Sequence, residues 1–244
     1  MTVLGGESME KKEKKGFDFK NMKEETIEVI VAIMLGVTAI FTAWASWIGS
    51  LHGGNQATNY TESNNLSAEG NSLWNEASQN YMQDMMIWNE ISQISIDLSF
   101  AEDKGDTEEA EKLEYKLDQI ISDNCTEEFQ EAIYWAIDQE DYATPFDMEG
   151  YADSYYAEAK ETIALGDEYL EEGKLDNKYG DACNLVTVIY SLVLFLLGIV
   201  GIFKKIPNRM IIVCVAAIGF IIATIYMITI PLPTGFSIAS FFQM

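Results

Sequence analysis

The sequence contains few basic residues, and this shortage limits what the protein can bind. Of its 244 residues, 15 are Lys or Arg and 39 are Asp or Glu, which gives a formal net charge of −24. A surface with this excess of acid repels nucleic acid and attracts cations and basic proteins. Nucleic acid is therefore excluded as a partner, whereas cations and a basic partner protein stay as candidates.

Histidine is rarer still, because the chain has one, His52. An imidazole can act as a general base or bind a metal, but a histidine mechanism needs a positioned partner, and no recognisable motif supplies one. The sequence also lacks a glycine-rich phosphate loop, a zinc-protease helix motif and a nucleophile elbow. We therefore expect His52 to be structural or solvated, and the protein to be non-enzymatic and without a cofactor.

Acidic residues occur in pairs, but their spacing does not build a metal-binding loop. A calcium loop alternates oxygen ligands around a glycine and ends on a glutamate. Neither residues 103–106 nor residues 176–181 fit that pattern. We expect weak, diffuse association of cations with the acidic surface and no dedicated metal site.

Three cysteines are too few to build a disulfide scaffold. Cys214 lies in the last apolar run and is expected to be a small packing residue. Cys125 and Cys183 both lie in an acidic segment, residues 51–184. The sequence leaves two alternatives for this pair, a disulfide bond or two free thiols.

Apolar residues, in contrast, form long runs. Residues 185–203 and 210–230 contain no charged residue, and each run reaches the length of about 20 residues that a helix needs to cross a bilayer core. Between them lies a short turn with Lys204, Lys205 and Arg209. Short loops rich in Lys and Arg stay in the cytoplasm, so these three residues are expected to set the topology.

A further span is expected at residues 26–50. A signal peptide is the alternative, because Lys residues precede the run and its Ala-Trp-Ala triplet at residues 43–45 resembles a cleavage site. The apolar region is about twenty residues long, however, against roughly 7–15 in a signal peptide. Trp44 and Trp47 also suit a membrane interface. We therefore expect a retained span.

These assignments predict a multi-pass protein of the cell membrane. Its order is a cytoplasmic polar tail at 1–25, a span at 26–50, an extracytoplasmic domain at 51–184, a span at 185–203, a basic cytoplasmic turn at 204–209, a span at 210–230 and an external tail at 231–244. The N-terminus is then cytoplasmic. Phe236, Phe241 and Phe242 suggest that the external tail lies against the membrane surface.

The extracytoplasmic domain holds most of the acid, with 32 Asp and Glu against 6 Lys, a net charge of −26. It shows no alternating strand pattern. Trp74, Tyr81 and Trp88 recur at seven residues, which puts them on one helix face. We expect these three rings to be buried against the later helices or a neighbouring subunit. A second seven-residue register contains Ala77, Ile91 and Leu98 and is interrupted by Asp84.

Local signals divide the rest of this domain into further helices. A turn is expected at residues 102–106, and helices are expected to open at Thr107 and Thr126, each followed by acids that favour a helix N-terminus. Pro145 marks a break. From about Glu149 a helix is expected to run into the second span, with a small face at Gly166, Gly173 and Gly180, which are spaced by sevens.

Small and hydroxyl residues form a stripe on each of the first two spans. Such stripes let helices approach closely and form hydrogen bonds, and they can also line a pore. Packing is the commoner cause, because no span carries a central charged residue. The predicted stripe consists of Thr38, Thr42, Ser46 and Gly49 in the first span and Thr187, Ser191, Gly198 and Gly201 in the second.

Three groups of residues between about Thr38 and Phe203 form a recognisable pattern. They are residues 42–47 with Gly54, Gln56, Ala57 and Tyr60; residues 144–148 with Tyr151; and Asn177, Asp181, Leu185, Thr187, Val188, Tyr190, Leu194, Phe195 and Gly198. In these residues the chain resembles a family of uncharacterised three-span membrane proteins of bacteria and archaea. The resemblance implies the three-span architecture and a prokaryotic source, and it implies no activity. The heavily acidic outer domain departs from the family's more neutral one.

The predicted fold is all-α, with three transmembrane helices and an extramembrane helical domain inserted between spans 1 and 2, its helices continuous with the spans. Two functions fit this arrangement. The first is a non-enzymatic scaffold or sensor in the lipid bilayer that presents the acidic helical domain and self-associates. The alternative is a homo-oligomeric cation channel with an acidic vestibule.

Overall fold

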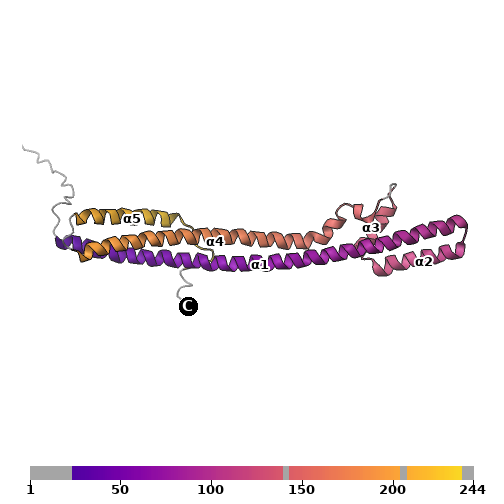
Figure 1. Ribbon diagram of the computed structural model, residues 1–244, viewed down its shortest axis with the longest axis horizontal. Coiled ribbons are helices and arrows are strands. Elements are labelled where there is room, and N and C mark those ends of the chain that lie inside the picture. The colour runs from indigo at the N-terminus through magenta and orange to yellow at the C-terminus, as the bar shows by residue number, and fades with distance from the viewer. Residues whose placement is uncertain (1–23, 140–142, 204–207, 238–244) are drawn as a thin grey trace, which may run out of the picture. The chain divides into compact units, whose positions relative to one another are not determined.

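The computed structural model describes residues 24–139, 143–203 and 208–237, and over that part the chain forms helices and no strand. The elements are α1 (Glu24–Lys104), α2 (Thr107–Asn124), α3 (Glu127–Ile137), the 3-10 helix η2 (Pro145–Asp147), α4 (Tyr151–Ile202) and α5 (Arg209–Thr229). Figure 1 labels the five α-helices. The chain divides into two compact units. Unit 1 comprises Met1–Gln56 and Leu175–Met244, and unit 2 comprises Ala57–Lys174.

Two of the helices belong to both units. α1 is one helix of 81 residues and α4 is one helix of 52 residues. Neither contains a proline, and each changes from apolar to polar sequence without a break. The prediction that these helices continue from the apolar runs into the polar segment is therefore confirmed.

Unit 1 is built from the first part of α1, the last part of α4, and α5. Buried residues of α1 recur at seven, namely Val31, Thr38, Ala45 and His52, and those of α4 do the same at Asp176, Cys183, Tyr190 and Leu197. A seven-residue repeat keeps one face of each helix against its neighbour, as in a coiled coil. A second row on α4, with Val193 and Val200, packs against Val213 and Ala216 of α5.

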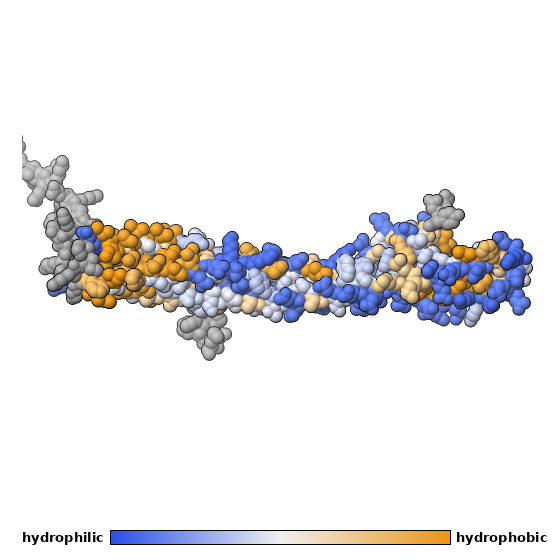
Figure 2. Space-filling view, in the orientation of Figure 1, coloured by the Kyte–Doolittle hydropathy of each residue, from blue (hydrophilic) through white to orange (hydrophobic). Residues whose placement is uncertain are grey.

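The outside of unit 1 is apolar as well. Ile40, Ile202 and Ile228 are 69 %, 75 % and 78 % exposed, and Figure 2 shows hydrophobic surface over α5 and the adjoining parts of α1 and α4. In water such a surface would be costly. Three helices, α1, α4 and α5, are long and apolar enough to cross a membrane.

Unit 2 has its own core, to which α1, α2, α3 and α4 contribute. Ile91 and Ile94 of α1 lie with Phe129 and Ile133 of α3 and with Tyr151 of α4. Leu113, Leu117 and Ile121 of α2 pack against this cluster. The unit is therefore a helical domain with an apolar centre.

The buried register of α1 in unit 2 is not the tryptophan register. Trp74 is 41 % exposed and its ring lies 4.5 Å from that of Tyr156, while Tyr81 and Trp88 are half-buried at the edge of the core. Within the chain, therefore, Trp74 is not buried against the later helices, and its burial against a neighbouring subunit stays a prediction. The second register, with Ala77, Asp84 and Ile91, is the one that is buried.

The helix boundaries follow the local signals. Gly105 has a φ of 71°, the Gly105 and Asp106 amides donate to Glu102 and Ala101, and α1 ends there in a Schellman motif. The Asp106 side chain caps α2 and the Thr126 hydroxyl caps α3, accepting from the Phe129 amide at 3.2 Å. The expected turn, the two helix starts and the break at Pro145 are confirmed.

Close approach of α1 and α4 depends on glycine. A Cβ on Gly173 would lie 2.5 Å from the ring of Tyr60 in unit 2, and one on Gly180 would lie 3.6 Å from the Gly49 carbonyl in unit 1. Gly166 is similarly confined, 3.3 Å from Leu66 and Ser63. The small face predicted from these three glycines is confirmed.

Candidate functional site

A polar pair occupies the heptad positions of α1 and α4 in unit 1. His52 continues the buried series of Ala45 on α1, and Asp176 precedes Cys183 in the series on α4. His52 is 1 % exposed and Asp176 is 8 % exposed. A buried charged or polar group is costly unless it is hydrogen-bonded, so these two side chains require partners inside the protein.

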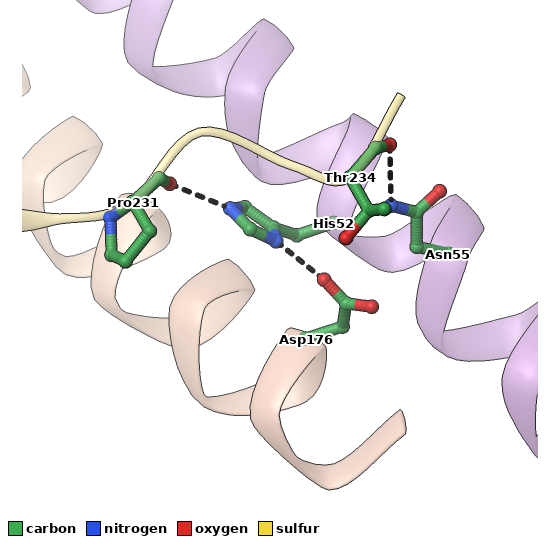
Figure 3. A network of polar contacts seen from close by, with 5 residues as sticks. All are labelled: His52, Asn55, Asp176, Pro231 and Thr234. Carbon is green, nitrogen blue, oxygen red and sulfur yellow. Dashed lines mark hydrogen bonds and ion pairs between the residues drawn. The ribbon is translucent and has the colours of Figure 1, made fainter. Parts of the chain in front are cut away.

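The two side chains bond to each other. His52 Nδ1 lies 2.7 Å from Asp176 Oδ1, and the ring's other nitrogen, Nε2, lies 3.1 Å from the main-chain carbonyl oxygen of Pro231 (Figure 3). The ring of Tyr179 lies 5.4 Å from the imidazole. One imidazole thus connects three parts of unit 1: α1, α4 and the segment that follows α5.

That segment, residues 231–237, is held at further points. Asn55 donates through Nδ2 to the Thr234 carbonyl oxygen at 3.1 Å (Figure 3). The ring of Phe236 lies 6.1 Å from Trp44 and 5.6 Å from Trp47. Residues 231–237 are called the strap below. Phe241 and Phe242, which were expected at the membrane surface, lie outside the described residues.

The geometry limits the chemistry of His52. Both ring nitrogens have a partner and the ring is buried, so neither nitrogen is available to a substrate or a metal. Among the residues that the structure describes, no three His, Cys, Asp or Glu side chains gather closely enough to hold a metal ion. What the site can do is bind or release a proton.

The sequence offers His52 as a candidate residue but does not identify its partners. Asp176 lies 124 residues away, and Pro231 contributes a main-chain carbonyl, which no sequence motif reveals. One signal was present: His52 stands seven residues after Ala45, and Asp176 stands seven before Cys183. Polar residues at two heptad positions point to a buried pair once the register is known.

A second buried polar group lies in unit 2. Asp84 is 5 % exposed, and the hydroxyls of Tyr151 and Tyr155 both donate to its Oδ2, the former at 2.7 Å. Thr126 hydrogen-bonds Tyr155. Burial, with the hydrogen bond to Asp84, raises the pKa of Tyr155 to about 12, and burial also raises the pKa of Tyr151.

Next to this network is an open cavity of about 240 Å³ lined by Thr126, Glu128, Ser154 and Tyr155. Cys125 precedes the lining residue Thr126 in the chain, and burial, with the charge of Asp84, raises the pKa of its thiol to about 11. A thiol with such a pKa is a poor nucleophile at neutral pH. Cys125 is therefore a structural residue.

The predicted stripe is divided between packed and open surface. On α1, Thr38 is buried and Gly49 packs against Cys183, whereas Thr42 is half-buried and Ser46 is exposed. On α4, Thr187 and Gly198 are half-buried, and Ser191 and Gly201 are exposed.

The stripe hydroxyls that have a described hydrogen bond use their own helix. Thr42 donates to the Thr38 carbonyl at 2.7 Å, Thr187 to Cys183 at 3.0 Å and Ser191 to Thr187 at 2.8 Å. These bonds join residues one helical turn apart. They do not cross from one helix to another.

The remaining predicted residues lie at the α4–α5 turn and in the two cores. Lys204 and Lys205 lie outside the described residues. Arg209 is buried and donates to the Val200 carbonyl at 3.0 Å, which places a positive charge near the C-terminus of α4. Cys125 and Cys183 are free thiols, each buried in the core of a different unit, so the structure has the second of the two alternatives.

No protein family, curated protein or solved structure matches this chain.

Proposed function

We propose that this chain is a three-span membrane protein that presents unit 2 outside the membrane to a basic, amphipathic helical partner, and that it works as a scaffold or sensor. The observation that carries the proposal is a row of exposed apolar side chains on a strongly acidic helical unit. The resemblance to three-span proteins of unknown activity agrees with this reading, and the orientation follows from the basic turn at residues 204–209.

The apolar row lies on α1 in unit 2. Its members are between 49 % and 74 % exposed, and they are Met82, Met85, Met86, Ile96 and Phe100. At about 100° per residue, the five positions fall within about 100° of the circumference of α1, which puts them on one side of the helix. Methionine is flexible and polarisable and is over-used where a surface must adapt to a helical partner. We call these five residues the apolar row.

The charge of unit 2 determines which partner fits. Residues 57–174 contain 30 Asp and Glu and 5 Lys, a net charge of −25. Four of the five lysines, Lys112, Lys116, Lys160 and Lys174, already pair with acids of the unit. A second copy of this surface would be repelled, whereas a helix with basic and apolar faces complements both features.

A connection from unit 2 to the apolar helices supports the role as a sensor. α1 and α4 each continue as a single hydrogen-bonded helix from unit 2 into unit 1. A partner that displaces either helix in unit 2 thus acts on an element that also builds the polar pair of His52 and Asp176. A loop between domain and span would not provide this coupling.

One observation favours the channel alternative. The hydroxyls of Ser46 and Ser191 are exposed in the single chain rather than packed inside it. In an oligomer these oxygens would face either a neighbouring subunit or a pore. Three spans are too few to enclose a pore in one subunit, so conduction would require a ring of copies. Purified oligomer in planar bilayers that passes cations, with selectivity falling as salt rises, would establish this alternative.

The scaffold proposal is tested with the full chain in nanodiscs and a synthetic helical peptide with lysine on one face and leucine on the other. We expect saturable binding that weakens with salt, because the charges are screened. Replacing Met82, Met85 and Met86 together by Ser is expected to weaken binding about tenfold or more, by removing apolar contact area.

The matched control replaces Asn75, Gln79 and Gln83, exposed polar residues of the same helix, by Ser. This triple variant is expected to bind like the parent chain. A peptide with Glu in place of Lys is expected not to bind. Equal binding of the basic and acidic peptides, or unchanged affinity in the methionine variant, would contradict the proposal.

A further inference from the structure

We propose that His52 and Asp176 form a proton-binding site that fastens the strap to α1 and α4 when it is protonated and releases the strap when it is not. The proposal goes beyond the presentation of unit 2, because it assigns a ligand, the proton, to a different part of the molecule. It rests on the hydrogen-bond geometry around one imidazole.

The two contacts of the imidazole need two hydrogens. A main-chain carbonyl can only accept, so the 3.1 Å contact between His52 Nε2 and the Pro231 oxygen requires a proton on Nε2. The 2.7 Å contact between Nδ1 and Asp176 Oδ1 requires a second proton, on either atom. Both bonds form together when the pair is an imidazolium and a carboxylate, or a neutral ring and a carboxylic acid.

Loss of one proton removes one of the two bonds. If the remaining proton stays on Nε2, the lone pair of Nδ1 faces a carboxylate. The proton goes to Nδ1, because a carboxylate is a stronger acceptor than a main-chain carbonyl, and the lone pair of Nε2 then faces the Pro231 carbonyl, so the bond to the strap is lost. The complete arrangement in Figure 3 is therefore the protonated one.

The surroundings leave His52 and Asp176 as the pair that responds. From Val29 to Asn59, α1 carries no ionisable side chain except His52, and the strap carries none. α4 contributes Asp176 and the ring of Tyr179, 5.4 Å from the imidazole. Imidazole is the side chain whose charge changes between about pH 5 and pH 8.

The strap is the element that moves. Besides the His52 contact, its attachments include the hydrogen bond from Asn55 to Thr234 and the packing of Phe236 on Trp44 and Trp47. The sign follows from the proton count: the held state binds one more proton, so the strap is held at lower pH and released as the pH rises.

The test uses the only histidine of the chain as its own probe. With 15N-histidine incorporated into an untagged chain in nanodiscs, His52 gives the single imidazole signal. At low pH we expect either two protonated ring nitrogens, or a protonated Nε2 with Nδ1 sharing a proton with Asp176. As the pH rises, we expect the pair to lose one proton. A ring that is neutral and unchanged from about pH 5 to about pH 8 would overturn the proposal.

Strap release is measured with a nitroxide on Thr234→Cys in a Cys214→Ala background. We expect the ratio of mobile to immobile label to rise about tenfold or more as the pH rises, with the same midpoint as the imidazole titration. The ratio changes tenfold for each unit by which the pKa of the pair differs between the held and the released state. A label whose mobility does not change with pH would overturn strap release.

Asp176→Asn separates proton binding from simple packing. An asparagine amide can donate to Nδ1 of a neutral imidazole that keeps its proton on Nε2, so both contacts survive without the extra proton. We expect this variant to hold the strap at every pH in that range. If its strap is released with rising pH as in the parent chain, the site is not proton-linked. These readouts do not involve peptide binding to unit 2, so each proposal can fail separately.

Discussion

At the scale of single residues, the most informative positions are polar side chains in heptad positions that an apolar residue would normally fill. Asp84 interrupts the series of Ala77 and Ile91, and it is buried because two tyrosines donate to it. An unpaired carboxylate at this position would not be tolerated. Asp84 and its tyrosines therefore fix how α4 lies against α1 within unit 2.

This arrangement predicts the effect of removing one donor. Tyr151→Phe leaves Asp84 with one tyrosine donor, and we expect the unfolding free energy to fall by about 1.5–3 kcal/mol, the range for hydrogen bonds to charged groups. Tyr115→Phe is the control, since Tyr115 is 67 % exposed. Denaturant unfolding followed by circular dichroism checks this. Equal stability of the two variants would show that the bond to Asp84 contributes nothing.

A pH prediction follows from the same network. Burial and Asp84 raise the pKa of Tyr155 from 10.0 to about 12, so the folded state holds this proton more tightly than the unfolded chain does. The stabilisation is complete below pH 10 and is lost as the pH rises through about 12. Unfolding free energy measured against pH should fall in that window and fall less steeply in Tyr155→Phe. The same slope in both proteins would contradict the assignment.

Sequence and structure agree on some residues and not on others for a physical reason. The caps at Asp106 and Thr126 were predictable because a cap is a contact between residues a few positions apart. The partners of His52 and Asp84 were not, because they come from residues 67 to 179 positions away. The centre of the contact falls on the register of Ala77 and Ile91 and not on that of the larger tryptophan rings, because a close helix pair favours small residues at its centre.

At the scale of the elements, the contact between α1 and α4 is set by glycine. A Cβ on Gly70 would lie 2.5 Å from the Ile163 side chain, 3.2 Å from its main-chain nitrogen and 3.3 Å from the Ala159 carbonyl. Two of these three neighbours are backbone atoms, which cannot rotate away. Gly53 of the same helix has nothing within 4 Å of a Cβ.

The two glycines give opposite predictions. Gly70→Ala is expected to lower the unfolding free energy by about 1–3 kcal/mol through overpacking. Gly53→Ala is expected to raise it by up to about 1 kcal/mol, because alanine favours a helix and meets no obstacle there. Thermal unfolding of both variants in the same detergent checks the pair. A stabilising Gly70→Ala would mean that α1 and α4 are not in close contact at that level.

At the scale of the whole molecule, hydropathy and charge divide the chain in the same place as the fold does. The structure has three helices long and apolar enough to cross a membrane, and the acidic residues are concentrated in unit 2. Apolar length and charge are summed properties of many residues, so both can be read from the sequence alone. The proposed orientation adds that unit 2 faces outward.

Orientation is the premise of the proposed function, and one measurement tests it most directly. Single cysteines replace Glu108, exposed on α2, or Ile206, in the basic turn, in a Cys214→Ala background whose other two thiols are buried. In intact cells a membrane-impermeant maleimide is expected to label Glu108→Cys at once, and to label Ile206→Cys only after permeabilisation. Labelling of Ile206→Cys in intact cells, with Glu108→Cys protected, would contradict an outward-facing unit 2.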